Sequence, residues 1–140
     1  MSRRNSKRQR LAGHFVPFPT QVLKSEAFVN LSSHAVKLLL DMLAQFRFGH
    51  NGDMSLAWRV MQSRGWKSRA TLDAARRDLL ASGLIMLTRQ GGRNLCCLYG
   101  VTWLAIDECG GKLEVNATRS PPGLWHDKTA SKSAEADGDS

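Results

Sequence analysis

The sequence predicts a small, mainly α-helical domain with one β-hairpin, which is an α+β fold. Two observations carry this prediction. Between residues 31 and 82, three segments place apolar residues at helical spacing, and after residue 83 two apolar runs flank a Gly-Gly pair. The chain has 140 residues, 42% of them hydrophobic, which suits one domain of about 100–150 residues with short tails.

The first predicted helix begins after Leu31. Ser32 or Ser33 can cap it, because a serine hydroxyl accepts hydrogen bonds from the N–H groups of the first turn. The residues that follow at i, i+3, i+4 and i+7 spacing form one apolar stripe: Ala35, Leu38, Leu39, Met42, Leu43 and Phe46. The other face carries Lys37, Asp41 and Gln45. Glycines in the segment 49–53 end the helix.

A short extended link at Met54–Leu56 leads into the second predicted helix. Ser55 is its expected cap, and it stops near Gly65. Its apolar residues are Leu56, Ala57, Val60 and Met61.

The third predicted helix begins after Ser68 and runs from Arg69 to Ser82. Gly83 ends it, because a glycine at this position adopts the left-handed conformation that closes a helix. The predicted inner face contains Leu72, Ala75, Leu79 and Leu80.

The two apolar runs Leu84–Thr88 and Leu95–Trp103 predict the hairpin, with Gly91-Gly92 in the loop between them. In the second run, alternate residues share one face: Leu95, Cys97, Tyr99, Val101 and Trp103. The complete order is helix, short strand, helix, turn, helix, hairpin. This order predicts a winged helix-turn-helix.

Tails flank this domain. Residues 1–13 form a basic arm, residues 14–116 form the winged-helix domain, and we expect residues 117–140 to be a disordered tail. Pro121-Pro122-Gly123 marks the boundary before the stretch 129–140, which has no large apolar residue and cannot offset its ordering entropy by burial.

The stretch from Ser68 to Ile85 resembles the recognition helix and first wing strand of bacterial winged-helix DNA-binding proteins. In that family a Ser/Thr-rich helix start and a terminal Leu-x-x-x-Gly-Leu-Ile recur. The N-terminal half is similar to initiator-type and helix-turn-helix proteins of phages, plasmids and integrated elements, at Phe15–Pro19, Leu23–Phe28, Leu31-Ser32 and Asn51–Asp53. Uncharacterised members of this group are also similar to the chain at Tyr99–Trp103 and Ile106–Leu113. The resemblance covers about residues 14–116 and implies DNA binding.

The sequence departs from the family pattern at two positions. Ala74 stands where such helices often place an arginine or glutamine that faces DNA. Arg76 stands where an aliphatic residue is common, so we expect its stem along the edge of the core and its charge outward.

The distribution of charge favours the same partner. The net charge is +8, and residues 59–93 alone hold eight basic residues against two acidic ones. Such an excess predicts a polyanionic partner, here double-stranded DNA. In a helix-turn-helix the second helix enters the major groove. The expected recognition-helix contacts are Lys67, Ser68, Arg69, Thr71, Asp73 and Arg77.

Arg69 is the leading base reader, since a guanidinium can donate two hydrogen bonds to guanine; the alternative is a solvated residue of the first turn. Asp73 either accepts a hydrogen bond from cytosine or pairs with Arg69 or Arg77 on the helix surface. The expected phosphate contacts are Arg59, Arg64 and Arg76, and the expected wing contacts are Arg89 and Arg93. A basic N-terminal arm adds Arg3, Arg4, Lys7, Arg8 and Arg10.

Catalysis, cofactors and metals find no support in the sequence. The four histidines are scattered, Cys96 and Cys97 point to opposite faces of a strand, and no nucleophile, base and orienting group can be assembled. We therefore predict a protein that is not an enzyme. The four tryptophans are expected in core and edge packing rather than as a platform for single strands: Trp58, Trp66, Trp103 and Trp125.

No apolar stretch approaches the roughly 20 residues of a membrane span, and an odd number of cysteines fits a reducing cytosol, so we expect a cytoplasmic protein without membrane contact. The first functional hypothesis is a DNA-binding regulator of transcription or replication in a mobile element or phage. The alternative is a protein-interaction module, such as a phage-encoded inhibitor or replisome adaptor, that docks through residues 107–140 with Trp125. Formation of a homodimer stays open.

Overall fold

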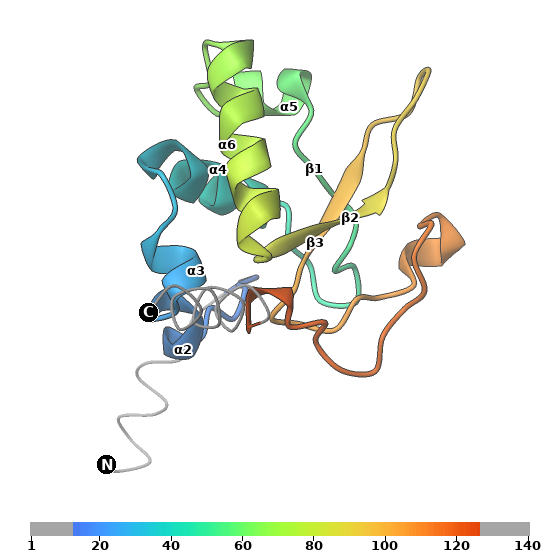
Figure 1. The fold of residues 1–140 in the computed structure, drawn as a ribbon. Coiled ribbons are helices and arrows are strands. Elements are labelled where there is room, and N and C mark those ends of the chain that lie inside the picture. The colour runs from blue at the N-terminus through green and yellow to red at the C-terminus, as the bar shows by residue number, and fades with distance from the viewer. Residues whose placement is uncertain (1–12, 127–140) are drawn as a thin grey trace, which may run out of the picture.

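The computed structural model describes residues 13–126 (Figure 1). The sequence predicts three helices, a short strand and a β-hairpin. The observed elements in chain order are α2 (Thr20–Leu23), α3 (Glu26–Val29), α4 (Ser33–Leu43), β1 (Met54–Ser55), α5 (Trp58–Gln62), α6 (Arg69–Ser82), β2 (Ile85–Arg89), β3 (Leu98–Val101) and the 3-10 helix η1 (Cys109–Gly111). The short helices α2, α3 and η1 were not predicted. The basic-arm residues of segment 1–12 and the tail 127–140 lie outside the described residues.

The three strands form one antiparallel sheet in the order β1-β3-β2. Met54 lies opposite Tyr99, and Ile85 lies opposite Val101. Strand β3 is therefore central, and all four of its residues are buried. The link that the sequence predicts as merely extended is thus an edge strand of the hairpin sheet. Helices with a small antiparallel sheet confirm the predicted α+β class.

Helices α4 and α6 pack against each other, and α6 also contacts β2 (Figure 1). Both helices begin where the sequence predicts. The Ser32 hydroxyl accepts from the Ala35 amide at 3.1 Å, and the Ser68 hydroxyl accepts from the Thr71 amide at 3.2 Å. Gly83 ends α6 at φ 81°, a conformation that favours glycine. The predicted apolar stripe of α4 is buried throughout.

Two predictions about polar side chains were wrong, those for Asp41 and Ser55. Asp41, placed on the face opposite the buried stripe, is only 6% exposed, because it accepts a hydrogen bond from the buried indole of Trp66. Gln45, from the same face, exchanges two hydrogen bonds with the backbone of Ser55 in β1. Ser55 is not the cap of α5; that position belongs to Ala57, whose amide donates to the Ser55 hydroxyl.

The hairpin is shorter than predicted on its second side. The run from Leu95 to Trp103 contributes a strand only at Leu98–Val101, and Leu95 is 56% exposed instead of sharing the buried face. The register shifts between Leu87 and Arg89, so the ladder is interrupted before the tip. At this interruption the Cys97 sulfur accepts a hydrogen bond from the Gly91 amide at 3.1 Å.

The packed domain continues past residue 116, where the sequence places its end. Trp125 is 7% exposed and belongs to the hydrophobic core. The Gly123 amide donates to the Thr102 carbonyl at 2.9 Å, which fixes the segment beside β3. Figure 1 shows this segment, in red, at the C-terminal end of α6. There a Cβ on Gly83 would lie 2.5 Å from the Leu124 carbonyl oxygen, so only glycine fits.

Candidate nucleic-acid interface

The predicted contact residues come from α5, α6 and the loop between β2 and β3. In Figure 1, α5, the start of α6 and the tip of that loop reach towards the same end of the molecule. Four of the predicted cations are exposed and make no ion pair or side-chain hydrogen bond within residues 13–126: Arg59, Lys67, Arg77 and Arg93. These side chains are available to phosphate.

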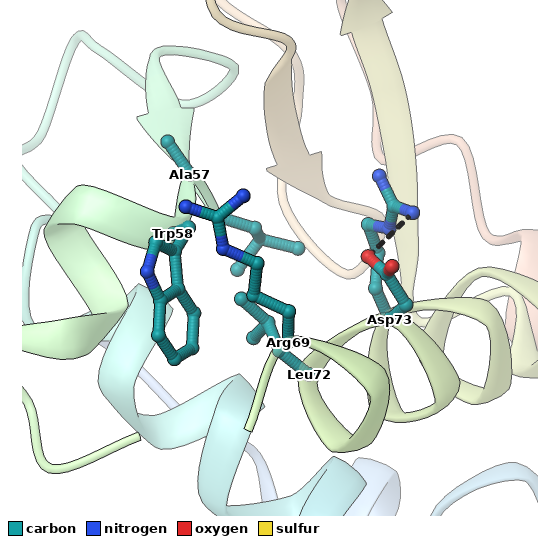
Figure 2. Close-up of a pocket in the computed structure, with 7 residues that line it drawn as sticks. Ala57, Trp58, Arg69, Leu72 and Asp73 are labelled. Carbon is teal, nitrogen blue, oxygen red and sulfur yellow. Dashed lines mark hydrogen bonds and ion pairs between the residues drawn. The ribbon is translucent and has the colours of Figure 1, made fainter. Parts of the chain in front are cut away.

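Arg69 is exposed at the first position of α6, and its guanidinium lies over the indole of Trp58, 5.4 Å from the ring centroid (Figure 2). Arg69 is thus an exposed first-turn residue, as the alternative to base reading expects, with an added cation–π contact. The hydroxyl of Ser68, also a predicted contact, is occupied as the cap of α6. Ser68 therefore orients the helix start.

Asp73 pairs with Arg76 at 3.0 Å, one helical turn away, rather than with Arg69 or Arg77 (Figure 2). Arg76 also lies close enough to the buried Tyr99 of β3 to act on its hydroxyl. Burial raises the pKa of the Tyr99 hydroxyl above its ordinary value of 10, so this group stays neutral at physiological pH. Arg76, predicted as a phosphate contact, is thus held at the edge of the core by Asp73, beside Tyr99.

Arg64 is also engaged inside the domain. Its Nε donates to Asp41 Oδ1 at 3.1 Å, while Oδ2 of the same carboxylate accepts from Lys37 at 2.6 Å and from Trp66 at 2.8 Å. Burial alone would raise the pKa of Asp41, but the hydrogen bonds from Lys37, Trp66 and Arg64 outweigh it and lower the pKa below its ordinary value of 3.8. The ionised carboxylate ties α4 to the turn between α5 and α6.

The two wing arginines differ. Arg89 turns back along its own hairpin and donates from Nη2 to the Cys96 carbonyl at 2.9 Å. Arg93 lies in the turn at the hairpin tip and is exposed. Arg93 is the wing residue that can reach a partner without breaking a hydrogen bond.

Thr71 lies apart from the other recognition-helix residues. It lines a shallow hollow of about 540 Å³ between the start of α4 and α6, with Ser32, His34, Ala70, Ala74 and Ala75. Arg69 and Asp73 instead line a deeper cavity of about 250 Å³ on the side of α5, with Leu56, Ala57, Trp58, Leu72 and Arg76 (Figure 2). The structure therefore brings Arg69, Asp73 and Arg76 together and leaves Thr71 outside this group.

Trp58 and Tyr99 contact the predicted residues but were not predicted as site residues. Trp58 opens α5 and precedes an arginine, a pattern that equally suits edge packing, and Tyr99 follows the alternation of a buried strand. The sequence around Trp58 and Tyr99 does not indicate a site, because each residue contacts the predicted residues only when different elements of the fold come together. Within residues 13–126, no three histidine, cysteine or carboxylate side chains gather to hold a metal.

The longest helix of the described part, α6, has 14 residues, and none of the helices there is both long and apolar enough to cross a bilayer. No protein-family model, curated protein or solved structure matches the chain.

Proposed function

We propose that this chain is a winged helix-turn-helix protein that binds duplex DNA and regulates transcription or replication of a mobile element or phage. The element order α4-β1-α5-α6-β2-β3 and the sheet order β1-β3-β2 support the fold assignment. In such a fold α6 is the recognition helix and the loop between β2 and β3 is the wing. The resemblance around Ser68–Ile85 supports the same reading.

The observation that carries the proposal is the set of exposed cations on these elements. Arg59 on α5, Lys67 in the turn, Arg77 on α6 and Arg93 on the wing tip are all unpaired within the described part of the chain. A duplex that receives α6 in its major groove presents phosphates on both sides of that helix. Cations before, on and after α6 match this geometry.

Arg69 is the base reader of the proposed complex. It stands at the N-terminal end of α6, the part of a recognition helix that reaches base edges. Its stacking on Trp58 limits the conformations of the guanidinium before binding, so less entropy is lost on hydrogen bonding to guanine. One such bidentate contact is worth about 1–3 kcal/mol of discrimination.

A salt series on duplex binding tests the proposal. Arg64, Arg76 and Arg89 are engaged inside the protein, which leaves Arg59, Lys67, Arg69, Arg77 and Arg93 for DNA. Four of these, all except the base reader Arg69, are phosphate contacts, so log K should fall with log salt at a slope of about −3.6, and the basic arm would steepen it. Affinity that depends neither on salt nor on Arg69→Ala would refute the proposal.

The alternative function, a protein-interaction module, loses one of its supports. Trp125, the expected docking residue of the C-terminal segment, is buried against its own domain. We include a cytoplasmic location in the proposal, since the three cysteines are all free thiols in the structure.

A further inference from the structure

Trp58 differs from the other three tryptophans of the chain. Trp66, Trp103 and Trp125 are each at most 7% exposed and belong to the core. Trp58 is half-buried and forms one wall of the 250 Å³ cavity between α5, the end of β1 and α6 (Figure 2). This one flat aromatic side chain packs against the core only in part and also lines a cavity.

The other walls of this cavity have complementary chemistry. Leu56, Ala57 and Leu72 form an apolar lining, and the Asp73–Arg76 pair supplies an acceptor and a donor at the edge. The ion pair at 3.0 Å holds the two side chains together, and Arg76 also lies near the Tyr99 hydroxyl. The polar edge is consequently oriented before anything binds.

Size restricts what can enter. The cavity is smaller than the roughly 300–1,000 Å³ of pockets that hold drug-sized ligands, so it suits one flat ring system. Proteins that read an unstacked base do so with an aromatic face and with hydrogen bonds to the edge of the base. Trp58 with Asp73 and Arg76 offers that combination.

We propose that this cavity binds a single unpaired nucleobase, stacked on Trp58 and hydrogen-bonded at its edge by Asp73 and Arg76. The inference rests on the proposed function, which brings a DNA strand to this face of the protein. Arg69 now lies over the indole; when a base enters the cavity, this exposed side chain exchanges its contact with the indole for one with the outer face of the base or with its phosphate. Guanine suits the edge best, because its N–H donors and its carbonyl stand side by side on one edge.

The nucleobase has two sources, an unpaired position in DNA or a free nucleotide. Three probes separate them: a fully paired duplex, the same duplex with one bulged guanosine, and dGMP alone. Each is titrated against wild type, Trp58→Leu, which removes the aromatic face, and Trp58→Phe, the matched control that keeps a ring. Urea unfolding of each variant monitors the fold.

We expect wild type to bind the bulged duplex about tenfold more tightly than the paired one, since one base–aromatic stack is worth about 1–3 kcal/mol and 1.4 kcal/mol is tenfold. The ratio of the two affinities cancels any change in phosphate binding. It should fall to about one in Trp58→Leu and stay well above one in Trp58→Phe. Binding of dGMP that requires Trp58, without a preference for the bulge, would assign the cavity to free nucleotides and still support a nucleobase site.

A preference for the bulge that persists in Trp58→Leu overturns the inference, and so does the absence of both bulge preference and dGMP binding in wild type. If wild type binds the paired duplex with the expected salt slope but shows neither effect, this inference fails and the proposed function stands. If neither duplex is bound, the proposed function fails. Should Trp58→Leu not fold, the exposed variant Asp73→Asn decides the matter: it should reduce the preference for bulged guanosine over bulged adenosine, and an unchanged preference contradicts the site.

Discussion

The turn between α5 and α6 and the loop between β2 and β3 each contain one arginine that bonds to another group of the protein and one exposed cation that does not. In the turn, Arg64 pairs with Asp41 and Lys67 is exposed. In the loop, Arg89 binds the Cys96 carbonyl and Arg93 is exposed. The difference lies in the inner partner: the turn uses a buried carboxylate shared with Trp66, whereas the loop uses a carbonyl of its own exposed backbone.

This difference assigns separate roles to the two regions. The buried carboxylate of Asp41, with its several donors, fixes the turn and with it the start of α6. Any movement of the turn would leave this buried charge without hydrogen-bond donors. The hydrogen bond of Arg89 lies at the surface and holds that side chain weakly, so Arg89 can be released more easily than Arg64. Within each region, the count of basic residues overstates the phosphate contacts by one.

The largest effect is expected for Asp41→Ala, which removes the partner that fixes the turn. Arg64 and Lys37 are half exposed and can be solvated after the change, but the buried Trp66 N–H loses its acceptor. We expect the free energy of unfolding to fall by about 2–3 kcal/mol, most of it from that unsatisfied donor. Urea unfolding measures it, and a loss below about 0.5 kcal/mol would show that the carboxylate does not fix the turn.

The same carboxylate makes the turn sensitive to acid. The folded-state pKa of Asp41 lies below its ordinary value of 3.8, so its stabilising effect is present above pH 4 and is lost as the pH falls through the folded-state pKa. Wild type should therefore lose more stability between pH 7 and pH 3 than Asp41→Asn, which has no carboxylate to protonate. Urea midpoints at the two pH values provide the test; equal losses contradict it.

The sequence predicted most of the helical part because its signals are local. Ser32, Ser68 and Gly83 are caps that act within one turn of the chain, and the apolar stripe of α4 repeats at helical spacing. Asp41 was misplaced because its acceptor role depends on Trp66, 25 positions later. The end of the domain was misplaced at residue 116 for the same reason: Trp125 was expected in core or edge packing, but its burial brings a whole segment into the domain through contacts with distant residues.

The site was predicted as a set of basic residues but not as an arrangement. The helical period places Arg69, Asp73 and Arg76 along one side of α6, which sequence spacing can indicate. It cannot indicate that Trp58 lies under Arg69 or that Tyr99 lies near Arg76, because those contacts cross from α5 and β3. Which arginines are engaged internally is therefore a property of the fold.

Arg64→Ala and Lys67→Ala separate the two roles within the turn. Arg64→Ala should lower the free energy of unfolding by about 1 kcal/mol, a value kept small because the guanidinium is 47% exposed and screened. It should leave the salt slope of duplex binding unchanged. Lys67→Ala should do the reverse, making the slope shallower by about 0.9 at unchanged stability. A salt slope altered by Arg64→Ala would place Arg64 among the phosphate contacts after all.

The loop provides the smallest effects and the sharpest contrast. Arg89→Ala removes one surface hydrogen bond to the Cys96 carbonyl, so we expect a loss of about 0.5–1 kcal/mol in unfolding free energy. Arg93→Ala removes an exposed side chain and should make the salt slope of duplex binding shallower by about 0.9 without changing the free energy of unfolding. If Arg89→Ala also makes the slope shallower, Arg89 leaves the Cys96 carbonyl when DNA binds. The wing would then contribute two phosphate contacts and the turn only one, since a carbonyl at the surface releases an arginine far more readily than the buried carboxylate of Asp41 does.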